Sequence, residues 1–244
     1  MQGLVRNAVL YVALVLGSGA ATAATMPAVT ASAYDRPAFD AHVSGLHNAV
    51  VEDFESFAMG EVFGGLATAV GVFDTLGATG SGGTVKGTAG NTGNGVFLRD
   101  RNVYGRSNTT AGGDSYLDSN DTYGLSWTIA GLGMFDRLFF TVSDIADSGA
   151  SFTILADGQQ VGSTISRQRN GAVDMVMLSF GTAVDTLTLH LRHSKLNDGF
   201  SIDDAGIGLS RGAAQTPSSV PLPPAVALLA GGIAALALFR RRRA

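Results

Sequence analysis

Hydrophobic and polar residues alternate with a period of two through much of the stretch from about 48 to 210, between frequent Gly, Asn, Asp and Ser residues. In 185–192, for example, leucines at every second position share one face, and Thr, His and Arg residues share the other. No amphipathic helical pattern in this stretch is longer than two turns. The alternation is typical of short, half-buried strands and predicts an all-β domain.

Further strands follow from the same pattern. Leu138, Phe140 and Val142 alternate in the same way, and the run 173–180 supplies another strand. The dipeptide Asp157-Gly158 between two strand-like runs is a strong hairpin signal. Turns at this spacing predict a single β-sandwich of jelly-roll type over 48–210. The segment 24–47 has little periodicity, and we expect it to be a lead-in outside the domain.

The segment 116–127 contains two Tyr residues, the only Trp and several amides and carboxylates, a mixture suited to gripping sugar rings. Trp127 has a second interpretation. Leu125, Trp127 and Ile129 alternate with Ser126 and Thr128, as residues on an inward strand face do. We therefore favour Trp127 as a core residue over a sugar platform.

The first 23 residues are predicted to be a secretory signal peptide. Arg6 precedes an apolar run at 8–16, and a stretch of small residues follows it. Cleavage by signal peptidase after Ala23 would put Ala21 and Ala23 at the usual small-residue positions. Nine apolar residues are about half of the ~20 needed to span a bilayer, so an N-terminal membrane anchor is the weaker interpretation.

The C-terminus combines three chemical zones. A linker at 211–219 leads into a proline-rich motif, an apolar run at 225–239 and a basic end. At 1.5 Å per residue the run covers about 22 Å, which is marginal for a hydrocarbon layer about 30 Å thick. The arginines should stay on the cytoplasmic side, so we expect a short transmembrane helix that begins near the last proline. The motif residues are Val220, Pro221, Leu222, Pro223 and Pro224, and the basic residues are Arg240, Arg241, Arg242 and Arg243.

This tail, 220–244, resembles the VPLPA-CTERM signal, a variant of PEP-CTERM. The resemblance implies that an exosortase, a membrane transpeptidase, cuts near the proline motif. The protein would then insert transiently in the inner membrane and pass to the cell envelope, the surface or the exterior. Pro224 departs from the family, which usually has alanine there. An ordinary C-terminally anchored periplasmic protein is the alternative.

The body of the chain differs from its two ends in net charge. The stretch from Tyr34 to Arg211 contains all 20 acidic residues and 11 basic ones, so it carries a net charge of −9. Such a surface repels nucleic acid and anionic membranes, but it suits cation-bridged contact with acidic polysaccharide. The absence of Cys excludes disulfides, zinc–thiolate sites and a cysteine nucleophile.

Acidic residues gather where the body opens and where it closes. Because the first and last strands of jelly rolls are often neighbours, these carboxylates could converge on Ca²⁺, which prefers six to eight oxygen ligands. The predicted ligands are Glu55 and Asp203, with Asp53, Asp198 and Asp204 in reserve. The alternative is that these side chains are solvated at turns and strand ends.

We find no catalytic constellation in the sequence. The histidines form no H-E-x-x-H motif, no G-x-S-x-G elbow follows the signal peptide, and the glycine-rich stretch 77–95 lacks the order of a phosphate loop. The opening and closing strings at 53–57 and 198–204 are similar to the bodies that accompany such sorting tails, which look like carbohydrate-binding jelly rolls. We expect a non-catalytic envelope or matrix protein that contacts polysaccharide. The alternative is a secreted carbohydrate-active hydrolase that uses Glu52, Asp53 and Glu55.

Overall fold

The computed structural model describes residues 26–77, 90–146, 149–196 and 198–212. The predicted signal peptide and sorting tail lie outside these residues. The described part is mostly antiparallel β-structure with one short helix, which confirms the all-β prediction. Its elements are β1 Ala28–Ala33, α1 Arg36–Ser44, β2 Leu46–Glu52, β3 Gly60–Val62, β4 Leu66–Thr68, β5 Gly71–Thr75, β6 Val96–Arg99, β7 Tyr116–Asp118, β8 Gly124–Ser143, β9 Ser151–Ala156, β10 Gln159–Ser166, β11 Val173–His193 and β12 Ser201–Ser210.

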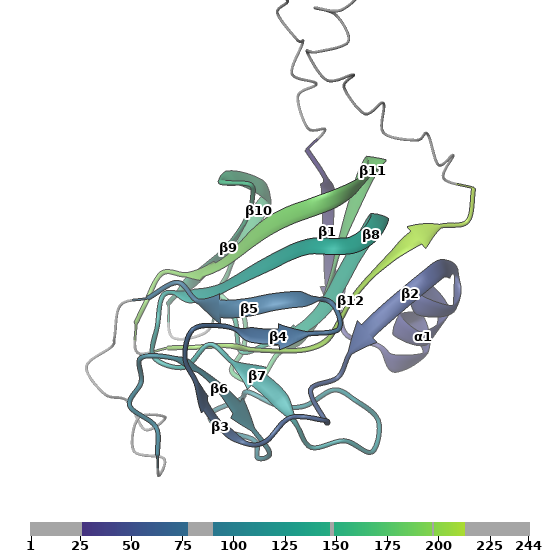
Figure 1. The fold of residues 1–244 in the computed structure, drawn as a ribbon. Coiled ribbons are helices and arrows are strands. Elements are labelled where there is room, and N and C mark those ends of the chain that lie inside the picture. Colours follow the sequence, from purple (N-terminus) through teal and green to yellow (C-terminus); the bar gives the residue numbers. More distant parts are fainter. Residues whose placement is uncertain (1–25, 78–89, 147–148, 197, 213–244) are drawn as a thin grey trace, which may run out of the picture.

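Two long strands, β8 and β11, each contribute to two layers (Figure 1). Their halves at 124–130 and 186–193 join β4, β5, β9 and β10 in what we call the front sheet. Their other halves, at 135–143 and 173–179, join β1 and β12 in the back sheet. β2 and the β7–β6–β3 group extend the back sheet from β12.

The bends of β8 and β11 lie together at one end of the sandwich. The β8–β11 pairing loses its register between Ser179 and Val184, and β8 has left-handed glycines at Gly131 and Gly133. β1 begins opposite Ser179 and β12 ends just after its pairing with the bend of β8, so both described chain ends leave at this bend end (Figure 1). The connections that join β8 to β9, β10 to β11 and β11 to β12 lie at the opposite end, which we call the loop end.

Trp127 is in the core, as predicted from its strand alternation, and is fully buried. Its ring stacks on Phe73 of the front sheet at 4.8 Å and meets Phe140 of the back sheet edge-on at 6.2 Å. The indole N–H donates to the Val70 carbonyl at 2.9 Å. Gly71 is required beside it, because a Cβ there would lie 2.4 Å from the Thr128 carbonyl oxygen.

Local strand predictions are confirmed. The leucines of 185–192 are buried in β11 and their polar neighbours face outward. Asp157 and Gly158 form the turn between β9 and β10, with positive φ values of 46° and 80°. Positive φ at both positions is what a tight type I′ hairpin turn requires.

Residues 26–47 differ from the prediction made for the segment 24–47, because they belong to the sandwich. β1 pairs with β11, and α1 packs on the outer face of the back sheet, where Phe39 meets Phe139 edge-on at 5.7 Å. Asp35 caps α1 by accepting the Ala38 N–H at 2.9 Å. The pattern was weak because β1 consists mainly of Ala, Ser and Thr. In the part of the chain that the structure describes, no helix is long and apolar enough to cross a membrane.

Candidate functional site

Two of the acidic residues predicted to bind calcium hold the loop 107–115 to the last strand. The Oδ2 atom of Asp203 accepts the backbone N–H groups of Thr109 and Thr110 at 2.7 and 3.0 Å. Its neighbour Asp204 accepts the Thr110 hydroxyl on Oδ1 at 2.9 Å. β12 is therefore tied to a segment that lies about ninety positions earlier in the chain.

Glu55 holds the same loop from the opening of the domain. Its Oε1 atom accepts the Asn108 side-chain amide at 3.0 Å. The same atom accepts the backbone N–H groups of Asp114 and Ser115 at 2.9 and 2.8 Å. Asp53 accepts the Glu55 N–H at 3.1 Å and so shapes the turn that presents Glu55. Glu55 and Asp203 therefore hold the same loop, 107–115, from the opening and the closing of the domain.

β12 bulges where these carboxylates lie. Its pairing with β8 shifts register between Asp203 and Gly206, and Asp204 has a φ of +46°. Burial raises the pKa of Asp203 to about 7 and also raises the pKa of Asp204. The Arg36 Nη1 atom, 3.4 Å from Asp204 Oδ2, is a partial counter-charge. Two adjacent buried carboxylates beside one exposed arginine favour the uptake of a proton or a cation.

Asp198 has a different neighbour. Its Oδ2 atom lies 3.9 Å from Nε2 of His193, which is buried at the loop end. His190 faces outward from the front sheet, so the two histidines point to opposite sides of β11. Within the described ranges, no group of three or more His, Asp or Glu side chains is arranged to hold a metal ion. Calcium binding by the acidic residues stays a prediction.

The carboxylates of the hydrolase alternative have backbone partners. Glu52 is buried, and its two oxygens accept the N–H groups of Phe54 and Ala69 at 3.0 and 3.1 Å. Glu55 and Asp53 accept the hydrogen bonds given above. In this arrangement the three side chains shape turns and a loop.

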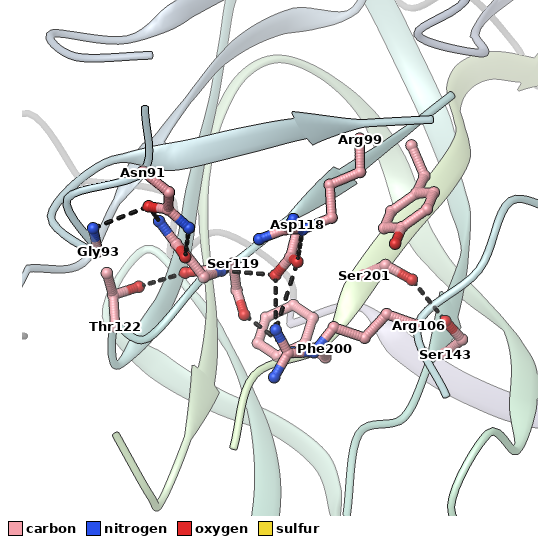
Figure 2. A network of polar contacts seen from close by, with 12 residues as sticks. Asn91, Gly93, Arg99, Arg106, Asp118, Ser119, Thr122, Ser143, Phe200 and Ser201 are labelled. Carbon is pink, nitrogen blue, oxygen red and sulfur yellow. Dashed lines mark hydrogen bonds and ion pairs between the residues drawn. The ribbon is translucent and has the colours of Figure 1, made fainter. Parts of the chain in front are cut away.

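A buried ion-pair network that we did not predict lies beside this loop (Figure 2). Asp118 of β7 is fully buried and pairs with two buried arginines, Arg99 of β6 and Arg106. Nη1 of Arg106 lies 3.1 Å from Asp118 Oδ1, which also accepts the Asn120 N–H at 2.7 Å. The guanidinium of Arg99 stacks over the Phe97 ring at 4.4 Å. The network therefore joins β6 and β7 to the segment that carries Arg106.

Amide groups continue the network toward the segment 91–95. The side chains of Asn91 and Asn120 donate to one another, each at 2.9 Å. Asn120 also donates to the Gly95 carbonyl at 2.9 Å. A sequence signal existed for part of this arrangement, because Arg99 and Asp118 are charged residues at the ends of apolar strands. Their pairing across 19 positions could not be predicted from that signal.

The aromatic residues of 116–127 do not form a sugar platform together. Tyr116 is fully buried and donates its hydroxyl to the Arg101 carbonyl at 2.6 Å. Tyr123 is 37% exposed, whereas Trp127 is in the core. The exposed aromatic residues of the described chain lie elsewhere, and Tyr104 and Phe63 are the most exposed of them.

The outward side of the front sheet, which we call the front face, carries a row of residues across four strands, three of which contribute a polar side chain. The pairing register places Asp74 of β5 opposite Ser126 of β8, Ser126 opposite His190 of β11, and His190 opposite Leu155 of β9. All four are partly exposed, while the residues that flank them on their strands are buried, except for the partly exposed Thr75. Polar groups at regular spacing on a flat sheet can donate and accept hydrogen bonds along an extended ligand.

The two outer faces of the sandwich differ in cover. α1, the single helix among the described residues, packs on the back sheet through Phe39, Phe139 and Met175. The front face keeps Thr128 and Val72 exposed in the row next to Ser126. The front face is therefore the open sheet surface in the described part of the chain.

Comparison with known proteins gives little that is similar. A scan against protein families finds none that matches the chain, and a search of curated proteins gives no match. Among solved structures, the CBM22-1 xylan-binding domain of Xyn10C from Paenibacillus barcinonensis is similar over 64% of this chain and 100% of that domain, at 13% sequence identity and a TM-score of 0.32.

Proposed function

We propose that this chain is an exported, non-catalytic protein of the cell envelope or matrix that contacts polysaccharide through its front face. The observation that carries the proposal is the polar row from Asp74 through Ser126 and His190, on a sheet that no described helix covers. The rigid core beneath it, with Trp127 stacked on Phe73, would hold these groups at fixed spacing. Fixed spacing lowers the ordering cost of binding an extended polymer.

Delivery to the envelope is the second part of the proposal, and it rests on the tail 220–244. Support comes from the placement of the described chain ends, since β1 begins and β12 ends at the bend end. A protein held by its C-terminus would present the loop end away from the membrane. A single exosortase cut near Pro221 would release or transfer the same body without changing its orientation toward ligand.

The sheet contact is tested with a double variant on the front face. His190→Ala with Asp74→Ala should weaken co-sedimentation with an insoluble polysaccharide several-fold, because two polar contacts are lost. The matched control is His47→Ala with Asp40→Ala, which removes the same side-chain types from exposed positions on β2 and α1. Equal binding by both double variants and the wild type would overturn the front-face assignment.

An assay for released sugar distinguishes the proposed function from the hydrolase alternative. Soluble sugar should not appear when the protein is incubated with the polysaccharide that it binds. The opposite result would be that the wild type releases sugar and a folded Glu52→Gln, Asp53→Asn or Glu55→Gln variant fails to do so. That result would contradict the proposal and show that the protein is a hydrolase.

Sorting is tested by the intact mass of the protein from the membrane and secreted fractions. We expect loss of residues 1–23 and of the arginine cluster. Mature material that keeps Arg240 to Arg243 would show a plain C-terminal anchor instead.

A further inference from the structure

We infer that the loop end of the sandwich binds anionic polysaccharide directly through arginine side chains. This inference rests on the proposed polysaccharide contact and names the chemical class of the polymer. It also replaces the cation-bridged contact expected from the net charge with direct ion pairing.

The surface consists of three connections that hydrogen bonds join at the loop end. Gln168 N–H donates to the Ala146 carbonyl at 3.0 Å, which links the β10–β11 and β8–β9 connections. Ser194 N–H donates to the Ser151 carbonyl at 3.0 Å, which links the β11–β12 connection to β9. The described residues of the three connections are therefore linked to one another at this end of the sandwich.

Basic residues gather on this surface. Arg167 and Arg169 are exposed on the β10–β11 connection, and Arg192 is exposed where β11 leaves the front face. Lys195 lies on the β11–β12 connection. Its Nζ atom is close to Gly149 of the β8–β9 connection, 3.7 Å from the position that a Cβ on Gly149 would take. The front face thus ends in a positively charged margin, although the body as a whole is acidic.

Exposed basic side chains outnumber acidic ones at this end, where Asp144 and Asp174 are buried and Asp198 is only partly exposed. Asp144 is 2% exposed and accepts the Gly171 N–H at 3.0 Å. Asp174 is 8% exposed and accepts the Gln168 side-chain amide at 3.0 Å. The sequence also places Asp147 in the β8–β9 connection, outside the described residues.

The arginines differ in what they pair with. None of the ion pairs found among the described residues involves Arg167, Arg169 or Arg192. By contrast, Arg137 at the bend end pairs with Asp136 at 3.3 Å, and Arg36 of α1 pairs with Asp40 at 2.8 Å. Guanidinium groups that have no carboxylate partner are suited to bidentate pairing with the carboxylates or sulfates of a polymer.

An exposed aromatic ring lies beside this margin. Tyr104 is 55% exposed and has a φ of +52° in a tight turn with Gly105. That turn lies directly against the β10–β11 connection, because a Cβ on Gly105 would be 2.6 Å from the Gly171 nitrogen and 2.7 Å from Asn170 Oδ1. A tyrosine ring next to cationic groups can stack on a sugar ring while the charges bind its acid groups.

The experiment measures binding of the wild-type body to sodium alginate, a carboxylated polymer, in the presence of chelator. We expect binding that persists in chelator and weakens steeply with added salt, since exposed ion pairs are screened. Arg167→Ser with Arg169→Ser should weaken alginate binding about fivefold or more at low salt. Arg137→Ser with Arg211→Ser removes two positive charges at the bend end and should leave alginate binding unchanged.

Binding to other polymers shows whether a negative result contradicts this inference alone or the proposed polysaccharide contact as well. Neutral dextran binding that needs His190 and Asp74, together with no preference for alginate, would overturn the anionic class and leave the front-face contact intact. No binding to any polysaccharide would overturn both. Double-stranded DNA that binds as tightly as alginate would show a general anion surface and would also overturn the inference. Thermal midpoints of all variants establish that each one is folded.

Discussion

The Nη1 atom of Arg106 lies 3.1 Å from Oδ1 of Asp118, and both side chains are buried between the strands of the back sheet and the segment that follows β6. A second buried arginine, Arg99, shares the same carboxylate. Asp118 therefore pairs with two buried cations. Burial alone would lower the pKa of Arg106, but the charges of Asp118, Asp144 and Asp121 raise it.

Asp118→Ala should destabilise the fold by about 3–5 kcal/mol, because it leaves two buried guanidinium groups without their carboxylate. The midpoint of urea unfolding measures this change. Asp100→Ala is the matched control, since the Asp100 side chain is 55% exposed and lies 3.8 Å from Arg101, whose side chain is 87% exposed. The control should cost at most about 1 kcal/mol. Equal costs for the two variants would contradict the role we assign to Asp118.

Trp127→Ala should cost about 3–5 kcal/mol, because it opens a cavity between the two sheets. Trp127→Phe keeps an aromatic ring beside Phe73 and Phe140 and should cost less, although the Val70 carbonyl loses its donor. As the only tryptophan, residue 127 also reports unfolding of the wild type by its fluorescence. Emission already at the wavelength of exposed indole in the native state would contradict its burial.

The sequence identified strands where one face is buried and the other is not. Leu189 and Trp127 follow that pattern, and they pair directly in the front sheet. The pattern could not show that residues 124–143 form one strand, because the bend at Gly131 and Gly133 depends on contacts between layers. It also could not identify β1, whose small side chains give no clear alternation.

The sequence likewise predicted part of the candidate site, namely its acidic residues, but not the loop that they bind. Convergence of Glu55 with Asp203 followed from the neighbouring first and last strands of a jelly roll. Their common partner, the loop 107–115, carries no apolar pattern, and its position is fixed by hydrogen bonds that span more than 50 residues. The front face combines residues from four separate strands, so only the pairing register brings them together.

Calcium should stabilise the protein if the predicted acidic ligands bind it. Asp203 and Asp204 are adjacent and buried, so a cation would relieve their mutual repulsion. Free calcium at about 100 times its dissociation constant would add about 2.7 kcal/mol to the free energy of unfolding. Asp203→Asn should remove that gain, whereas Asp198→Asn should keep it. An identical thermal midpoint in calcium and in chelator would contradict the prediction.

Glu61 should make the segment 92–95 sensitive to acid. Burial alone would raise its pKa, but backbone N–H groups of Gly95, Thr92 and Asn94 donate to the carboxylate at 2.5 to 2.8 Å and lower the pKa below 4.5. The unfolded chain therefore binds this proton more readily than the folded one. The stabilisation is complete above pH 4.5 and is lost as the pH falls through the lower, folded pKa.

The unfolding midpoint of the wild type should consequently fall between about pH 5 and 3 more steeply than that of Glu61→Gln, which cannot titrate there. The protection of the Thr92, Asn94 and Gly95 amides against hydrogen exchange, relative to their intrinsic rates at each pH, should fall over the same range, because their acceptor loses its charge. Parallel curves for the wild type and Glu61→Gln would show that these three hydrogen bonds do not depend on the ionised carboxylate. In that case Glu61 would fix the segment through its shape alone, and the protection of the amides would be the same at both ends of the pH range.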